Sequence, residues 1–265
     1  MKGWNKVREI EDELKKIIIN PDIQQVLFEV LDISSEIPKI DAILVIGSVA
    51  KNLYRDGISD IDILLLTSGL EEDIIDTYKN RKINFMKNDD IYTCEKVSFL
   101  NICVRNTTDF IEHIESIILG NHIESVQKNW SIGGANEEVL LCDLSQALIY
   151  MDKDSRVKNL IIGLNNNYFI KYKKNVLEKL KNGFNQKREL TIMNSQNQLL
   201  FLQGFLECIV LLSRIDCLES NHYNPGFKHL VRDGSIFLEN YNIRECIKKK
   251  WDNGFLLDML KKVTV

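Results

Sequence analysis

A Gly-Ser pair and two aspartates, set between two short apolar runs, constrain the fold of this chain more than any other feature. The first run, Ala42–Ile46, is apolar and β-branched enough for a buried strand, and it ends at Gly47 and Ser48. The second run, Ile63–Leu66, directly follows Asp62. This order predicts a strand, a glycine turn, a short helix and a second strand. The first free N–H groups of the helix, together with the Ser48 hydroxyl, could then bind a phosphate.

The two aspartates, Asp60 and Asp62, are spaced i, i+2. Side chains alternate along a strand, so both carboxylates should point the same way while Ile61 and Ile63 point into the core. Two neighbouring anions repel each other, which makes sense mainly if a divalent cation lies between them. Mg²⁺ is the expected ion because it prefers oxygen ligands and keeps positions open for water and substrate phosphates.

The complete pattern resembles the signature of the nucleotidyltransferase superfamily, which includes DNA polymerase β and the antibiotic nucleotidyltransferases. That signature is an apolar strand, Gly-Ser or Gly-Gly, a helix, and Asp-x-Asp or Asp-x-Glu on the next strand, and every part is present here in order. A bare Asp-x-Asp pair is common in solvated turns, but the full pattern is much more specific. The layout of the whole chain resembles the two-domain antibiotic enzymes, namely the larger lincosamide nucleotidyltransferases and the kanamycin-type enzymes.

This resemblance implies Mg²⁺-dependent transfer of a nucleoside monophosphate, AMP from ATP, to a hydroxyl of a small-molecule acceptor, with release of pyrophosphate. Metal ions held by Asp60 and Asp62 would clamp the triphosphate and stabilise the in-line transition state. Gly47 and Ser48 would hold the β and γ phosphates. The resemblance does not identify the acceptor, although an antibiotic is consistent with the family.

Three basic residues are candidates for further phosphate contacts. Lys51 and Arg55 should lie on the short helix, where they could add positive charge. Lys228, in the segment Tyr-Asn-Pro-Gly-Phe-Lys-His, could reach the triphosphate from a helical domain, as in several nucleotidyltransferases. The alternative for each is an exposed, solvated charge on a helix.

The chain departs from the family at the third carboxylate, which normally lies on a later strand near the pair. The corresponding strand offers Asn101, which can ligate a metal or hydrogen-bond but cannot take a proton. Glu95 precedes this strand and Asp109 follows it. The resemblance to lincosamide-type enzymes favours Asp109 as general base. The alternative is an ordinary acid in a first helical turn, with Thr107 or Thr108 as N-cap.

Composition and charge are typical of a soluble cytoplasmic enzyme and favour a small-molecule or protein acceptor. The formal net charge of −4 gives no global attraction to nucleic acid, which argues against a nucleic-acid partner. The six cysteines show no CxxC spacing and indicate reduced, buried thiols. We see no signal peptide and no run long enough to span a membrane. The oligomeric state is left open, a homodimer included.

Hydrophobic periodicity predicts an α+β fold, with strands and helices followed by an all-helical region, rather than repeating βαβ units. The resemblance to nucleotidyltransferases implies that the sheet is mixed and flanked by helices. Two helices over 5–33, broken near 20–22, should precede the sheet. The other expected elements are strands at 41–46, 60–67, 82–87 and 96–104, helices at 70–80 and 108–119, and a strand pair at 137–142 and 146–151. Helical spacing across 190–218 predicts a long core helix. We expect a nucleotidyltransferase domain over 1–158 and a helical domain over 159–265.

Two other classes of function stay open at this point. The first is a non-catalytic or regulatory nucleotide-binding protein, which Asn101 in place of a carboxylate would favour. The second is a nucleotidyltransferase that acts on a protein or an RNA end. Metal-dependent pyrophosphate release separates the first class from an enzyme, and the mass of each acceptor after reaction separates the second.

Overall fold

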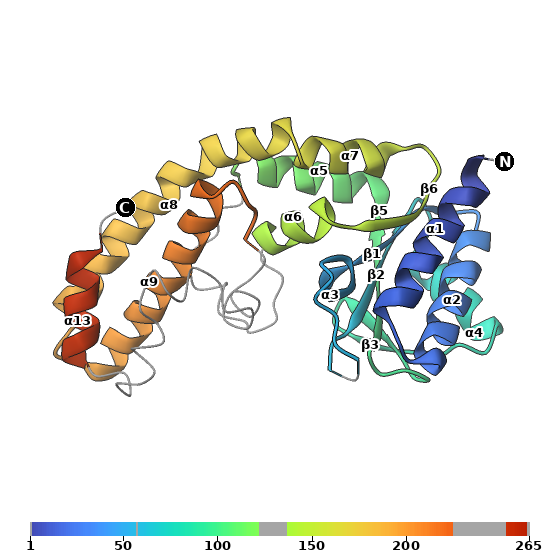
Figure 1. Ribbon diagram of the computed structural model, residues 1–265, viewed down its shortest axis with the longest axis horizontal. Helices are drawn as coiled ribbons and strands as arrows, with labels where there is room; N and C mark the ends of the chain where they lie inside the picture. Colours follow the sequence, from blue (N-terminus) through green and yellow to red (C-terminus); the bar gives the residue numbers. More distant parts are fainter. Residues whose placement is uncertain (1, 57, 122–136, 225–252, 264–265) are drawn as a thin grey trace. The chain divides into compact units, whose positions relative to one another are not determined.

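The computed structural model describes residues 2–56, 58–121, 137–224 and 253–263 (Figure 1). The strands are β1 (Ile40–Ile46), β2 (Ile61–Thr67), β3 (Phe85–Asn88), β4 (Ile91–Cys94), β5 (Leu100–Asn106) and β6 (Leu148–Asp152). The described helices are α1 (Lys2–Ile17), α2 (Pro21–Glu36), α3 (Gly47–Ala50), α4 (Glu71–Asn80), α5 (Thr107–Ile118), α6 (Glu137–Ser145), α7 (Arg156–Leu164), α8 (Asn167–Met193), α9 (Gln198–Glu219) and α13 (Asn253–Lys262).

The chain divides into two compact units. The first consists of Met1–Glu115 and Asp143–Asn165, and the second of Ser116–Cys142 and Asn166–Val265. The first unit contains the whole sheet, while every described element of the second is helical. The α+β fold with a helical C-terminal region is therefore confirmed. The proposed domain boundary at residue 158 stays a prediction.

The six strands form one mixed sheet in the order β3-β4-β5-β2-β1-β6. β2 and β5 are parallel, and the other neighbouring strands are antiparallel. Because β2 and β5 run in the same direction, residues at the start of both strands meet at one end of the sheet. Asp62 pairs with Asn101 at that end.

Apolar residues cover both faces of this sheet. On one face, Ile61 and Ile63 pack in a core cluster with Leu27 of α2 and Tyr78 of α4, and α1, α2 and α4 lie together there (Figure 1). The expected inward direction of the two isoleucines is confirmed. On the other face, alternate residues of β1 and β2 are also fully or almost fully buried: Ala42, Leu44, Leu64 and Leu66. Residue alternation places Asp62 on this second face.

Most elements up to β6 lie within a few residues of their predicted ranges, but two segments differ in kind from the prediction. The segment 137–142, predicted as a strand, belongs to helix α6. Its apolar run is short, and short runs do not separate helix from strand by periodicity. Strand β4, which pairs with β3 in a hairpin, was not predicted, because both strands have only four residues. The chain turns between the two strands at Asp89, which has a φ of +53°.

The helical unit is built around α8 and α9. One long helix was predicted across 190–218, but the chain leaves α8 at Met193, with Asn194 as C-cap, and begins α9 at Gln198. Its core includes Phe184, Phe201 and Phe205. Leu199, expected on the buried side, is 80% exposed. The helix starts at Gln198, so Leu199 lies in its first turn.

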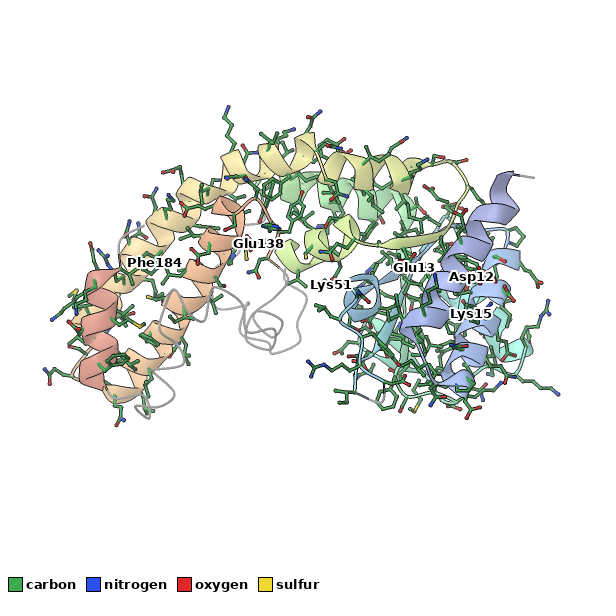
Figure 2. All side chains as sticks on the ribbon, viewed as in Figure 1. Asp12, Glu13, Lys15, Lys51, Glu138 and Phe184 are labelled. Carbon is green, nitrogen blue, oxygen red and sulfur yellow. The ribbon has the colours of Figure 1, made fainter. Side chains whose placement is uncertain are left out.

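One buried charge is fixed inside the helical unit. Glu138 (labelled in Figure 2) accepts hydrogen bonds from Arg214 at 2.8 and 2.9 Å and from the Tyr172 hydroxyl at 2.6 Å. All three side chains are buried, and burial together with the Glu138 charge raises the pKa of Tyr172 well above its ordinary value. The hydrogen bonds of this carboxylate connect α6, α8 and α9, which indicates a structural role for Glu138.

By length and composition α9 could cross a membrane, but 61% of its most apolar window is buried within the structure. A core helix passes the same test. The five described cysteines are free thiols, three of them buried.

Candidate active site

The turn after β1 brings Gly47 against Asp62. Gly47 has a φ of +70°, in the left-handed region that favours glycine. A Cβ added there would lie 2.7 Å from Asp62 Oδ2, closer than real Cβ atoms approach. Glycine is therefore required both by the backbone and by the neighbouring carboxylate. The turn and the aspartate are separated by fourteen residues in the sequence, yet the Asp62 carboxylate fills the space beside Gly47.

Ser48 ties the same turn to the other aspartate. Its hydroxyl donates a hydrogen bond of 3.0 Å to the backbone carbonyl of Asp60. Asp60 directly precedes β2 and is exposed, whereas Asp62 is the second residue of the strand and is half-buried. The strand thus begins one residue later than predicted. The role of Ser48 as a phosphate ligand stays a prediction. In this structure the Ser48 hydroxyl donates its proton to the Asp60 carbonyl, so donation to a phosphate would require that bond to break.

Asp62 lies in a row of polar side chains that crosses three strands. Asn101 of β5 donates from Nδ2 to Asp62 Oδ1 at 3.2 Å. Thr93 of β4 donates from its hydroxyl to Asn101 Oδ1 at 2.9 Å. Both contacts follow from the register, in which Asn101 pairs with Asp62 on one side and with Thr93 on the other.

The donor set at this end of the sheet fits Mg²⁺. Asp60 and Asp62 are two residues apart and supply carboxylate oxygens, the ligands that Mg²⁺ prefers. Within the described ranges, no group of three His, Cys, Asp or Glu side chains could hold a metal ion. If Asp60 and Asp62 held one Mg²⁺ ion, two carboxylates would leave positions open for water and substrate phosphates.

Lys51, labelled in Figure 2, is engaged in a buried ion pair. It lies directly after α3 as the C-cap, and its Nζ is 2.5 Å from Asp143 Oδ1 in α6. The Lys51 side chain is only 3% exposed. Burial raises the pKa of Asp143, and the neighbouring Lys51 charge partly opposes this. Lys51 therefore anchors the turn in this structure, and phosphate binding by Lys51 would require release from Asp143.

Arg55 and Tyr54 belong to the loop between α3 and β2, not to a helix as predicted for Arg55. The four-residue α3 ends before them. Arg55 is exposed. Burial, followed by the hydrogen bond to Asp56 and the charges of Asp56 and Asp60, raises the pKa of the Tyr54 phenol.

Residues 27–118 match the family model described as nucleotidyltransferase domain. The chain carries a nucleotidyltransferase domain. The match begins within α2 and ends with α5, so it contains the Gly-Ser turn, both aspartates and Asn101. Nucleotidyl transfer in general, with a nucleoside triphosphate as substrate, follows from this match. No curated protein matches the chain.

Within the nucleotidyltransferase domain, Asp109 does not lie with the aspartate pair. It follows the last residue of β5, Asn106, whereas Asp62 pairs with Asn101 near the first. The five residues from Asn101 to Asn106 span about 17 Å of strand. The exposed Asp109 therefore lies at the opposite end of the sheet, which argues against it as general base. Its helix is capped by Asn106, whose Oδ1 accepts the N–H groups of Thr108 and Asp109, not by a threonine.

Glu95 lies at the same end of the sheet as the pair. It follows β4, whose Thr93 faces Asn101 in antiparallel register, so it extends beyond the start of β5. Its backbone N–H is fixed by a hydrogen bond of 3.0 Å to the Asn84 carbonyl, and it is exposed. Lys228 lies outside the described residues.

Two residues of the site escaped prediction from the sequence. Thr93 belongs to β4, which gave no recognisable strand signal, and its role depends on pairing with β5. Asp143 follows a segment that was predicted as a strand, and no local pattern links it to Lys51. Both depend on long-range contacts that a single sequence does not encode in its periodicity.

Proposed function

We propose that this protein transfers AMP from ATP to a hydroxyl of a small-molecule acceptor, with Mg²⁺ held by Asp60 and Asp62. One observation carries the proposal: the Asp62 carboxylate lies where a side chain on Gly47 would be, 2.7 Å from a Cβ built there, and Ser48 hydrogen-bonds the carbonyl of Asp60. A triphosphate bound along the glycine turn would therefore lie beside the two carboxylates. That juxtaposition is what metal-assisted transfer of a nucleotidyl group requires.

The reaction forms a bond between the acceptor oxygen and the α-phosphorus and breaks the bond from that phosphorus to the oxygen bridging to the β-phosphate. Pyrophosphate leaves, and the acceptor loses its hydroxyl proton. When bound, Mg²⁺ would neutralise charge on the triphosphate and on the leaving pyrophosphate. Asp60 and Asp62 would hold the ion, and the missing side chain of Gly47 would let the backbone approach the phosphates.

The hydroxyl proton needs an acceptor, and Asn101 cannot serve. We infer that Glu95 serves in this role, because among the described carboxylates it lies beyond the start of β5 at the end where Asp62 pairs with Asn101. It replaces Asp109, which is separated from the pair by the length of β5. Glu95 is exposed, so an incoming acceptor can reach it.

The acceptor class rests on charge and on resemblance. The net charge of −4 disfavours a polyanionic acceptor, and the two-part layout resembles that of antibiotic nucleotidyltransferases. We therefore propose that the acceptor is a small compound with a hydroxyl group, such as an antibiotic, and that it is modified in the cytoplasm. The division into a nucleotidyltransferase domain, 1–158, and a helical domain, 159–265, belongs to this proposal, as does a role for Lys228 in binding the triphosphate.

A second candidate function is nucleotide binding without catalysis. The specific observation in its favour is that Asn101, in the place of the usual third carboxylate, donates a hydrogen bond to Asp62 instead of supplying a negative charge. A regulatory protein could retain the turn and the metal pair for binding alone. The same experiment separates the two candidates.

The test is to incubate the full-length protein with ATP, Mg²⁺ and a panel of hydroxyl compounds that includes lincosamides and aminoglycosides. We expect pyrophosphate release that depends on one acceptor and a mass gain of one AMP on that acceptor. Asp62→Asn is the matched negative control. If ATP binds but no acceptor in small-molecule, protein or RNA panels gains AMP, the non-catalytic function is favoured and the proposed reaction is wrong.

A further inference from the structure

Three side chains from three neighbouring strands form a directed chain of hydrogen bonds that ends on Asp62. The Thr93 hydroxyl lies 2.9 Å from Asn101 Oδ1, and Asn101 Nδ2 lies 3.2 Å from Asp62 Oδ1. The three residues occupy paired positions on β4, β5 and β2. Thr93 and Asn101 are both half-buried, so the contacts are partly protected from water.

The direction of this chain decides what Asn101 can do. A threonine hydroxyl can donate to the amide oxygen, and an amide oxygen accepts but never donates. With its oxygen committed to Thr93, Asn101 turns its NH₂ group towards Asp62. An amide NH₂ is a donor and offers no lone pair to a metal ion. Asn101 therefore acts on the carboxylate, not as a ligand in place of the usual third acid.

The two oxygens of Asp62 are consequently distinguished. Oδ1 accepts the hydrogen bond from Asn101, while Oδ2 is the atom closest to a Cβ built on Gly47, at 2.7 Å. The hydrogen bond thus fixes the rotation of the carboxylate so that Oδ2 faces the glycine turn. A carboxylate that rotates freely would lose conformational entropy when it binds an ion, and this loss would weaken binding.

We propose that Thr93 and Asn101 are positioning residues that orient the Asp62 carboxylate for Mg²⁺, with Thr93 fixing the orientation of the Asn101 amide. This inference rests on the proposed function, because it takes Asp62 to be a metal ligand. It assigns the third-carboxylate position of this chain to orientation rather than to metal binding or proton transfer.

The consequence of removing the Thr93 hydroxyl can be worked out from the same contacts. Thr93→Val has nearly the same shape and a strong strand preference, and it removes the described hydrogen bond to the Asn101 amide oxygen. The Asn101 amide can then rotate and turn its oxygen towards the Asp62 carboxylate, where two acceptors repel. Losing such an outer hydrogen bond typically weakens metal binding about 10- to 100-fold.

The test measures Mn²⁺ binding to the full-length protein by the loss of the free-ion EPR signal, with Mn²⁺ as the probe ion. The variants are Thr93→Val, Thr93→Ser, Asn101→Ala and Asp62→Asn. Thr77→Val is the matched control, since the Thr77 hydroxyl bonds only the Asp73 carbonyl of its own helix at 2.8 Å among the contacts described. Urea unfolding of each variant confirms that it is folded.

We expect Thr93→Val and Asn101→Ala to bind Mn²⁺ about 10- to 100-fold more weakly, Thr93→Ser to retain wild-type affinity, and Thr77→Val to be unchanged. The same two weakened variants should need more Mg²⁺ for half-maximal turnover while kcat at saturating Mg²⁺ changes less. A purely structural role for Thr93 would lower stability without this metal-specific shift.

Two failures are distinguishable. If Asp62→Asn binds Mn²⁺ as tightly as the wild type, Asp62 is not a metal ligand, the metal pair of the proposed function is wrong, and this inference is lost with it. If Asp62→Asn loses Mn²⁺ while a folded Thr93→Val keeps wild-type affinity, Asp62 stands as a ligand and the positioning role of Thr93 alone is overturned.

Discussion

Replacing Gly47 with alanine would test the turn and Asp62 at the same time. A left-handed φ of +70° costs a non-glycine residue about 1–2 kcal/mol. The new Cβ would also lie 2.7 Å from Asp62 Oδ2, so the carboxylate must move away from its position. That movement strains the hydrogen bond that Asp62 accepts from Asn101. A hydrogen bond to a charged group contributes about 1.5–3 kcal/mol, which corresponds to about 10- to 100-fold in a binding constant.

We therefore expect Gly47→Ala to lower the free energy of unfolding by about 1–2 kcal/mol and to weaken Mn²⁺ binding about 10- to 100-fold. Two other glycines separate these effects. Gly120 has a φ of +75° and its Cβ would lie 3.3 Å from Asn175 Cβ, so Gly120→Ala should lose stability but keep Mn²⁺ affinity. Gly183 is inside α8 with no described heavy atom within 4 Å of its Cβ position, and Gly183→Ala should stabilise the protein by about 0.5–1 kcal/mol.

The measurements are urea unfolding for stability and titration of Mn²⁺ followed by EPR for binding. If Gly47→Ala loses stability like Gly120→Ala but binds Mn²⁺ like the wild type, the contact between the turn and Asp62 has no role in the metal site. If Gly47→Ala changes neither quantity, the left-handed turn itself is refuted.

Three further predictions follow from the site. Asp62→Asn should cut Mg²⁺-dependent pyrophosphate release by several orders of magnitude in a coupled assay while urea unfolding stays close to wild type, and retained turnover would contradict the metal assignment. Lys51→Met should lower the free energy of unfolding by about 3–5 kcal/mol, because it leaves Asp143 buried and unpaired, whereas adding Asp143→Leu should restore most of that loss. Asp109→Asn should leave kcat within about twofold of wild type, and Glu95→Gln should lower it about 10²- to 10⁴-fold in the same assay. The reverse result would place the base at the far end of β5.

The central elements were predictable because their apolar patterns are strong and their lengths ordinary. β1 and β2 are buried strands with continuous apolar runs, and α2 begins at Pro21 after an Asn20 cap, as Asn-Pro-Asp indicates. Helix α6 was mistaken for a strand because its apolar run is only a few residues long. Its buried positions, among them Leu141 and Leu144, have helical spacing that is visible only once burial is known.

The site was predictable only where one local motif encodes it. Gly47, Ser48, Asp60 and Asp62 lie within sixteen residues, and contacts among them follow from one strand-turn-strand unit. The position of Asp109 depends instead on the parallel pairing of β2 with β5, which puts the end of β5 far from the pair. The direction of a neighbouring strand cannot be read from the periodicity of either strand.

The pairing of β1 with β6 has a consequence for how this sheet is made. Val45 and Leu148 are partners although they lie about a hundred residues apart in the chain. During synthesis, β1 must keep an open edge until β6 emerges, and open edges recruit other strands. Contacts between such distant residues also slow folding. A fragment confined to 27–118 would leave the edge of β1 uncovered, so we expect it to aggregate, whereas a fragment reaching Asn165 would carry the strand that seals it.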